Sequence, residues 1–143
     1  MAKRILLVEN EKNLARFVSL ELQKESFLVD LAETGQEGLA LAKDVDYDLL
    51  LLNYDLQDMT ASDFAKQLSL IKPASVIIVL ASREEIAEQQ EAIQHFAVSY
   101  VVKPFIISDL VERVSIIFRG RDFIDQHCSC LLYTSDAADD SLR

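Results

Sequence analysis

The stretch Tyr47-Asp48-Leu49-Leu50-Leu51-Leu52-Asn53-Tyr54-Asp55 decides the fold of this 143-residue chain. Four consecutive leucines followed at once by polar residues are typical of a strand that is buried on both faces of a parallel sheet. Open α/β sheets build their sites beyond the carboxyl ends of such strands. This strand ends at Asn53, and the neutral amide of an asparagine cannot accept a phosphoryl group as an acyl phosphate.

The rest of the chain alternates between strand and helix periodicity. Short apolar runs predict strands at residues 4–8, 28–32, 47–52, 76–80 and 100–102. Apolar residues recur at helical spacing between these runs and after the last of them. Strands that alternate with helices of this length form βαβ crossovers. The sequence therefore predicts an α/β fold, a five-stranded doubly wound parallel sheet with strand order 2-1-3-4-5 and helices on both faces.

Local residue types predict where several helices begin and end. Asn10 is placed to cap the first helix, and Ser108 is placed to cap the last one. Thr34 and Glu37 have the spacing of a capping box for the second helix. Gly120 begins a segment without helical periodicity, so we expect the last helix to end there.

These boundaries give a domain at residues 1–120 and a linker or helix extension at residues 121–129. Residues 130–143 resemble the reading-frame translation of a sequencing-library transposon adapter, and such a scar is excluded from fold reasoning. We therefore expect a truncated gene product with a non-native tail. A natural disordered tail is the alternative.

The charge of the chain limits its partners. The net charge is −10, and binding of a nucleic-acid backbone draws heavily on Lys and Arg, so we expect any DNA contact to come from another domain. The sequence has no apolar run of the roughly 18 residues that a membrane-spanning helix needs, and the apolar stretch near Met1 is too short for a signal peptide. We expect a cytoplasmic protein without membrane contact.

Catalytic and metal-binding motifs do not emerge from the sequence. Cys128 and Cys130, with His127 beside them, form one short cluster, whereas zinc sites draw ligands from at least two elements. The chain has no Ser-His-acid set and no glycine-rich phosphate loop, and it has three glycines in total. We expect that it is not an enzyme.

Polar residues follow three of the predicted strands. These residues are Glu9-Asn10-Glu11 after the first strand, Asn53 after the third, and Lys103-Pro104-Phe105 after the fifth. The carboxyl ends of parallel strands meet at one edge of a sheet, so we expect these residues to lie side by side.

Over about residues 3–119 the chain resembles the receiver domain of bacterial response regulators, the phosphoacceptor half of two-component systems. Four blocks fall in the order and spacing of that family: Val8-Glu9-Asn10-Glu11, the Leu51-Leu52-Asn53 strand end with Met59 six residues on, Val79-Leu80-Ala81-Ser82, and Tyr100-Val101-Val102-Lys103-Pro104-Phe105. Lys-Pro-Phe alone is a weak signal, whereas four blocks in register are specific. The predicted sheet is then of the flavodoxin-like type.

The resemblance implies a phosphoacceptor site from which this chain departs. In the family, an acidic pair after the first strand and a backbone carbonyl hold magnesium, and an aspartate after the third strand accepts the phosphoryl group. Here Glu9 keeps one metal-binding carboxylate, Asn10 replaces the second, and Asp55 supplies the carbonyl. Asn53 stands at the phosphoacceptor position. We therefore expect a vestigial magnesium site, weak or absent, and no other cofactor.

The resemblance also implies a switch, in which a hydroxyl after the fourth strand pairs with an aromatic residue on the fifth strand. Ala81 has lost that hydroxyl, so nothing draws the ring of Tyr100 inward. Ser82 has a hydroxyl one position late, but the alternation of a strand aims it elsewhere.

The retained residues also have plain structural roles. Lys103, which in the family binds the phosphoryl oxygens, can instead form an ion pair with Glu9 or Glu11. Glu11 also suits the first turn of a helix, where the dipole favours a carboxylate. Tyr100 can be a part-exposed aromatic residue of the sheet.

Two functions fit these observations. The first is an atypical, phosphorylation-independent receiver of a two-component system that regulates transcription through a DNA-binding domain missing from this chain. Its partner would be a sensor kinase or a second copy, with a homodimer through helix 4, strand 5 and helix 5, where Ile106, Val111 and residues 116–118 are apolar. The second is a stand-alone pseudo-receiver that docks on a kinase or another regulator. A helix-turn-helix or winged-helix segment after Gly120 would favour the first, and an early stop codon the second.

Overall fold

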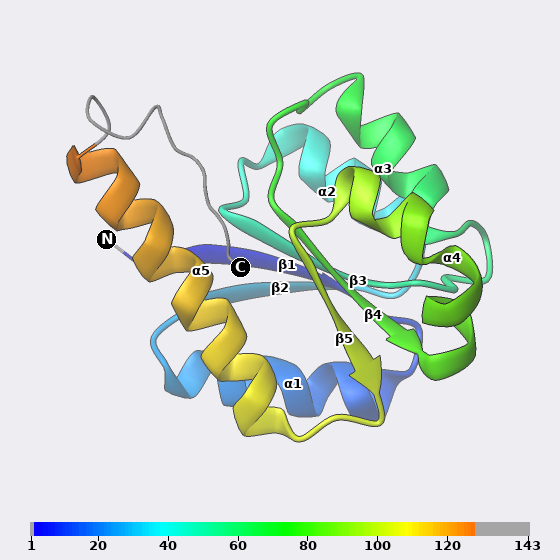
Figure 1. Cartoon of the computed structure of the whole chain (residues 1–143), viewed down its shortest axis with the longest axis horizontal. Helices are drawn as coiled ribbons and strands as arrows, with labels where there is room; N and C mark the ends of the chain where they lie inside the picture. The colour runs from blue at the N-terminus through cyan, green and yellow to red at the C-terminus, as the bar shows by residue number, and fades with distance from the viewer. Residues whose placement is uncertain (1, 128–143) are drawn as a thin grey trace. The chain divides into compact units, whose positions relative to one another are not determined.

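The computed structural model describes residues 2–127, with side chains described as far as Gly120. Strands and helices alternate in the order β1 (Arg4–Val8), α1 (Lys12–Lys24), β2 (Leu28–Ala32), α2 (Gly35–Asp44), β3 (Leu49–Asn53), α3 (Ala61–Ser69), β4 (Ile77–Ser82), α4 (Arg83–Phe96), β5 (Ser99–Lys103) and α5 (Ile107–His127). Every strand pairs in parallel, in the order β2-β1-β3-β4-β5 (Figure 1). The predicted doubly wound fold is confirmed.

The described residues fall into two compact units, which divide between Ile107 and Ser108. In the first unit, α2, α3 and α4 cover one face of the sheet and α1 lies on the other (Figure 1). In the second unit, Leu110, Val114 and Phe118 are buried and fall at helical spacing along α5.

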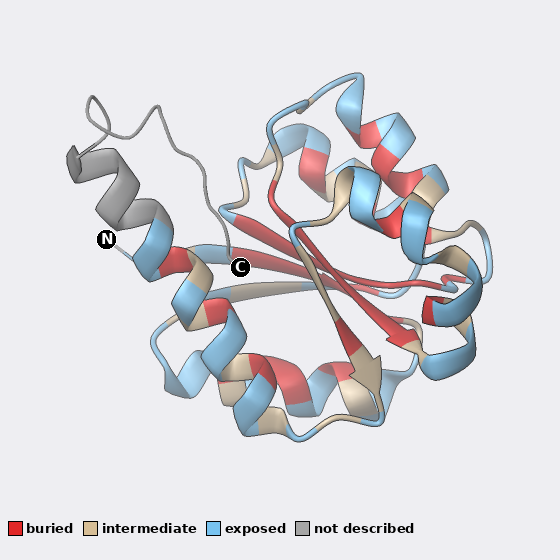
Figure 2. Ribbon diagram, in the orientation of Figure 1, coloured by how far each residue is buried: buried red, intermediate tan, exposed pale blue. Residues whose placement is uncertain are grey.

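The leucine strand β3 is the centre of the core. All five of its residues are buried (Figure 2). Leu50 and Leu52 belong to the same buried cluster as Phe64 of α3, and the alternation of the strand turns Leu49 and Leu51 to the opposite face. Each buried leucine stabilises the fold by roughly 1.5–3 kcal/mol, before the ordering entropy of the chain is subtracted.

Two predicted helix caps have different outcomes. Thr34 caps α2 as expected, because its hydroxyl accepts a hydrogen bond from the backbone N–H of Glu37 at 3.1 Å. The Glu37 carboxylate accepts from the N–H of Glu33 instead of returning to Thr34, so the box is incomplete. The cap expected at Asn10 is wrong: α1 begins at Lys12, and its cap position has no side-chain hydrogen bond.

The predicted ends of α5 are also wrong. The helix begins at Ile107, so Ser108 lies inside its first turn and does not precede it. The helix continues through Gly120 to His127. Gly120 is therefore an interior residue, which a helix tolerates at a cost of about 1 kcal/mol relative to alanine.

Candidate functional site

The polar residues predicted at the strand ends meet at the carboxyl edge of the sheet. Lys103 at the end of β5 reaches Asn53 at the end of β3, with its ammonium nitrogen Nζ 2.9 Å from the amide oxygen Oδ1. The same nitrogen lies 3.0 Å from Oε1 of Glu9, which follows β1. Because β4 lies between β3 and β5, the lysine side chain spans the end of β4 to make these contacts.

The amide of Asn53 is fully engaged. Its nitrogen Nδ2 donates to the side-chain oxygen Oδ1 of Asn10 at 2.8 Å and to the backbone carbonyl of Asp55 at 2.9 Å. Its oxygen accepts from Lys103, and the residue is 7 % exposed. An aspartate would fill the same space but has no N–H to give to the oxygens of Asn10 and Asp55. The arrangement therefore suits an amide at this position.

Glu9 is a buried carboxylate, 1 % exposed, with a partner for each oxygen. Oε1 accepts from Lys103, and Oε2 accepts from the backbone N–H of Glu11 at 3.1 Å. Lys103 thus pairs with Glu9, one of the two structural ion pairs that the sequence allowed. One buried negative charge and one positive charge leave the pair neutral, as buried charges require.

The three expected metal ligands lie around Asn53, but they do not fit a magnesium ion. Of the three expected ligand groups only the Glu9 side chain is a carboxylate, and Lys103 already neutralises its charge. The oxygens of Asn10 and Asp55 point to the N–H₂ group of Asn53. Magnesium needs several hard oxygen ligands and binds mainly through carboxylate charge. The N–H₂ group of Asn53 lies between these oxygens, where a metal ion would lie in a metal site.

The other predicted positions lie at the edge of this network. Ala81 is fully buried and brings only a methyl group to the end of β4. Tyr100 is partly exposed and packs against the buried cluster. Ser82 is engaged elsewhere, because its hydroxyl accepts from the N–H of Glu85 at 3.0 Å and caps α4. The hydroxyl of Ser82 therefore takes no part in the contacts of Asn53.

A further polar contact at this edge of the sheet was not predicted from the sequence. The carboxylate of Asp58, in the loop after β3, accepts from the backbone N–H groups of Gly35 at 2.9 Å and Gln36 at 3.0 Å, at the start of α2. Burial raises the pKa of Asp58, but the backbone hydrogen bonds outweigh burial and hold the pKa below its usual range. No local spacing signals this contact, because its partners are separated by more than 20 residues.

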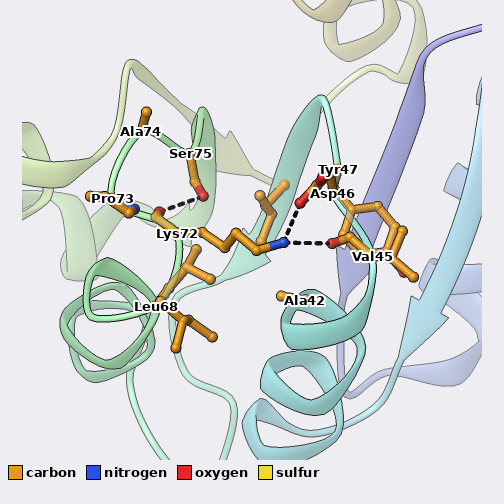
Figure 3. Close-up of a pocket in the computed structure, with 11 residues that line it drawn as sticks. Ala42, Val45, Asp46, Tyr47, Leu68, Lys72, Pro73, Ala74 and Ser75 are labelled. Atoms are coloured by element: carbon orange, nitrogen blue, oxygen red, sulfur yellow. Dashed lines mark hydrogen bonds and ion pairs between the residues drawn. The ribbon is translucent and has the colours of Figure 1, made fainter.

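A hollow of about 290 Å³ lies at the opposite edge of the sheet, between the segments that lead into β3 and β4 (Figure 3). Leu50, Leu68 and Ala42 are among its apolar lining residues. The ammonium of Lys72 forms an ion pair with Asp46 at its rim (Figure 3). No residue of the Asn53 network lines this hollow, so it is separate from the candidate site.

Comparison with known proteins identifies the family. The sequence profile of the response regulator receiver domain matches residues 5–115. Response regulator ArlR of Staphylococcus epidermidis is 35% identical over 124 residues, which is 85% of this chain and 56% of that protein. The chain spans about half the length of the curated relatives it matches. Among residues 2–127, no helix has the length and apolar character needed to cross a membrane.

Two solved structures are more similar in sequence. One, described as "A novel family of redox sensors in the streptococci evolved from two-component response regulators", is 55% identical with a TM-score of 0.85, and the match covers 99% of this chain and 60% of that one. The other, described as "RitR mutant - C128S", is 60% identical with a TM-score of 0.85, and the match covers 90% of this chain and 56% of that one.

Proposed function

Since the chain belongs to the response regulator receiver family, we propose that it is a two-component receiver domain whose output does not depend on phosphorylation. The observation that carries this proposal is the hydrogen bonding of Asn53, whose amide group is held by Lys103, Asn10 and the carbonyl of Asp55. The side chain at the phosphoacceptor position thus has a structural role in place of a chemical one.

The physical case against phosphoryl transfer has three parts. The Asn53 amide is uncharged and a very poor nucleophile. The magnesium that would neutralise the transferring group lacks its ligands, because Glu9 is paired with Lys103 and the neighbouring oxygens are hydrogen-bonded to the amide. Ala81 provides no hydroxyl to hold a phosphoryl oxygen. Each loss affects a different part of the reaction, so replacing one residue leaves two defects in place.

The test is treatment of the full chain with acetyl phosphate and magnesium, followed by intact-mass measurement. We expect no gain of mass, and the variant Asn53→Asp is expected to be labelled only in part, because Asn10 and Ala81 are unchanged. A conventional receiver treated in parallel shows that the reagent is active. A stable, acid-labile gain of one phosphoryl group on the unmodified chain would refute the proposal.

We propose that the output is regulation of transcription, through a DNA-binding domain outside this chain. The support is that the curated response regulators it matches are about twice as long as the matched segment. A homodimer involving α4, β5 and α5 stays part of this proposal, and Ile106 and Ile116 are exposed apolar side chains in that region of the sequence. A stand-alone module that docks on a kinase is the alternative, and the natural coding sequence after Gly120 distinguishes the two.

A specific observation favours thiol oxidation as the input. Solved relatives that are 60% identical carry changes written C128S and C128D, and a 55% identical relative is described as a streptococcal redox sensor. This chain also has a cysteine at position 128, which lies outside the described residues. We propose that a peroxide oxidises the Cys128 thiolate to a sulfenic acid, with cleavage of the peroxide O–O bond and release of water. A second thiol then forms a disulfide and releases a second water.

Hydrogen peroxide treatment of the full chain tests this input independently of phosphorylation. We expect a dithiothreitol-reversible product, seen as a mass gain of one oxygen or as a disulfide on non-reducing electrophoresis. The product should be lost in Cys128→Ser and kept in Cys130→Ser. Equal oxidation of the Cys128→Ser variant would refute the assignment to Cys128 and leave the proposal about Asn53 untouched.

A further inference from the structure

A groove of about 620 Å³ runs between α3 and α4, two helices that lie side by side on one face of the sheet (Figure 1). Small side chains make the space. Ser62, Ala65 and Ser69 line it from α3 at helical spacing, and Ala92 lines it from α4. The volume lies within the range of roughly 300–1,000 Å³ that is usual for small-molecule sites.

One hydroxyl beside this groove has unmet hydrogen-bonding capacity. The hydroxyl oxygen of Ser62 is buried and has no hydrogen-bond partner among the residues whose side chains the structure describes. Buried hydroxyls in folded proteins are almost always hydrogen-bonded. Tyr54, which is 9 % exposed, adds a second hydroxyl-bearing side chain to the lining of the groove.

The charged residues around the groove indicate which kind of ligand it can bind. Lys66 and His95 are its only ionisable lining residues apart from the phenol of Tyr54, and no carboxylate lines it. This is notable in a chain whose net charge is −10. The aromatic rings of Phe96 and Tyr54 add flat apolar surface.

We propose that this groove binds a small organic anion with an aromatic body, such as an aromatic carboxylate. The carboxylate pairs with the Lys66 ammonium, and the ring packs against Ala65, Ala92 and Phe96. The site is distinct from the Asn53 network, none of whose members line the groove, and the proposal does not depend on the absence of phosphorylation.

The test uses 1-naphthoate as the probe, titrated into the isotope-labelled full chain and followed by amide chemical shifts in heteronuclear NMR. We expect saturable shifts in α3 and α4, with a dissociation constant of about 0.1–1 mM for a ligand of this size. The neutral analogue 1-naphthalenemethanol should bind several-fold more weakly. Equal affinity for the two probes would overturn the assignment of an anion site.

Two variants locate the site. Ala92→Leu fills the groove and should abolish the shifts, whereas Lys66→Gln keeps the shape and should weaken binding by about three- to tenfold. Lys43→Gln, which removes an exposed lysine from α2, is the matched control and should leave binding unchanged. Binding that survives in Ala92→Leu, or that falls equally in the Lys66 and Lys43 variants, overturns the proposal. If Ala92→Leu fails to fold by circular dichroism, the comparison of the two lysine variants decides.

Discussion

Replacing Lys103 by methionine tests whether the candidate site is a structural network. Methionine keeps most of the apolar stem but removes the ammonium that contacts Glu9 at 3.0 Å and Asn53 at 2.9 Å. Glu9 then keeps only the N–H of Glu11 as a hydrogen-bond donor, at 1 % exposure. The variant therefore leaves a buried carboxylate without its counter-charge.

The magnitude follows from the exposure of the two partners. Removing one partner of a fully buried ion pair costs about 3–5 kcal/mol. The Lys103 side chain is 24% exposed, so water can replace part of its contact with Glu9. We therefore expect the free energy of unfolding to fall by about 2–3 kcal/mol at neutral pH.

Urea unfolding followed by far-UV circular dichroism is the suitable assay, since the chain has no tryptophan. Lys43→Met on the exposed face of α2 is the matched control, with an expected change below about 0.5 kcal/mol. Adding Glu9→Gln to Lys103→Met should recover at least about 1 kcal/mol, which measures the coupling of the pair. The reasoning fails if Lys103→Met costs no more than Lys43→Met, or if Glu9→Gln does not lower its cost.

Four further substitutions test other contacts by the same unfolding assay. Gly38→Ala should destabilise the fold by about 1–2 kcal/mol, because the new Cβ would lie 2.8 Å from the Cγ2 atom of Val8. At Gly120 a new Cβ meets no atom within 4 Å, so Gly120→Ala should stabilise α5 by about 0.5–1 kcal/mol. Equal effects of the two substitutions would contradict this packing. Asp58→Asn should lower the free energy of unfolding by about 0.5–1 kcal/mol at neutral pH. Since folding lowers the pKa of Asp58, this loss should vanish as the pH falls through the folded-state pKa. A loss of stability that persists in acid would count against this contact. Asn53→Asp should destabilise by about 1–2 kcal/mol in EDTA, and an unchanged midpoint would show that the amide hydrogens contribute nothing.

The strands were the most predictable part of the fold. The run Leu49–Leu52 indicates a buried strand, since its four apolar residues have no polar face and are too few for a typical helix. The ends were less predictable, because apolar patterning reports burial whereas strand ends depend on backbone pairing. Asn53 and Ser82 are polar, yet their backbones still pair with the neighbouring strands, opposite Leu80 and Lys103 respectively.

Tertiary contacts explain the errors at helix starts and the features that sequence could not reveal. Asn10 has the residue type of a helix cap, but its side-chain oxygen is taken by Asn53, 43 residues away. The ion pair of Lys103 with Glu9 was foreseeable, because the resemblance to a known family places both residues at one edge of the sheet. The hydrogen bond of Asp58 to the start of α2 was not foreseeable, since it depends on loop geometry and joins residues 23 positions apart. The same holds for the groove beside Tyr54, which arises from small side chains on two separate helices.

The substitutions at the candidate site depend on one another. The N–H₂ group of Asn53 donates to two oxygen acceptors at 2.8–2.9 Å, the side chain of Asn10 and the carbonyl of Asp55. An aspartate at position 10 would accept the same hydrogen bond but would add a second carboxylate near Glu9, with a single lysine to neutralise both. An aspartate at position 53 would turn the contact with the Asp55 carbonyl into oxygen–oxygen repulsion unless a cation entered, and Asn10 would have to turn its amide to donate to it. Asn10 and Asn53 therefore work as a pair that replaces the cation by hydrogen bonds, so restoring either carboxylate alone should cost stability before it restores any chemistry.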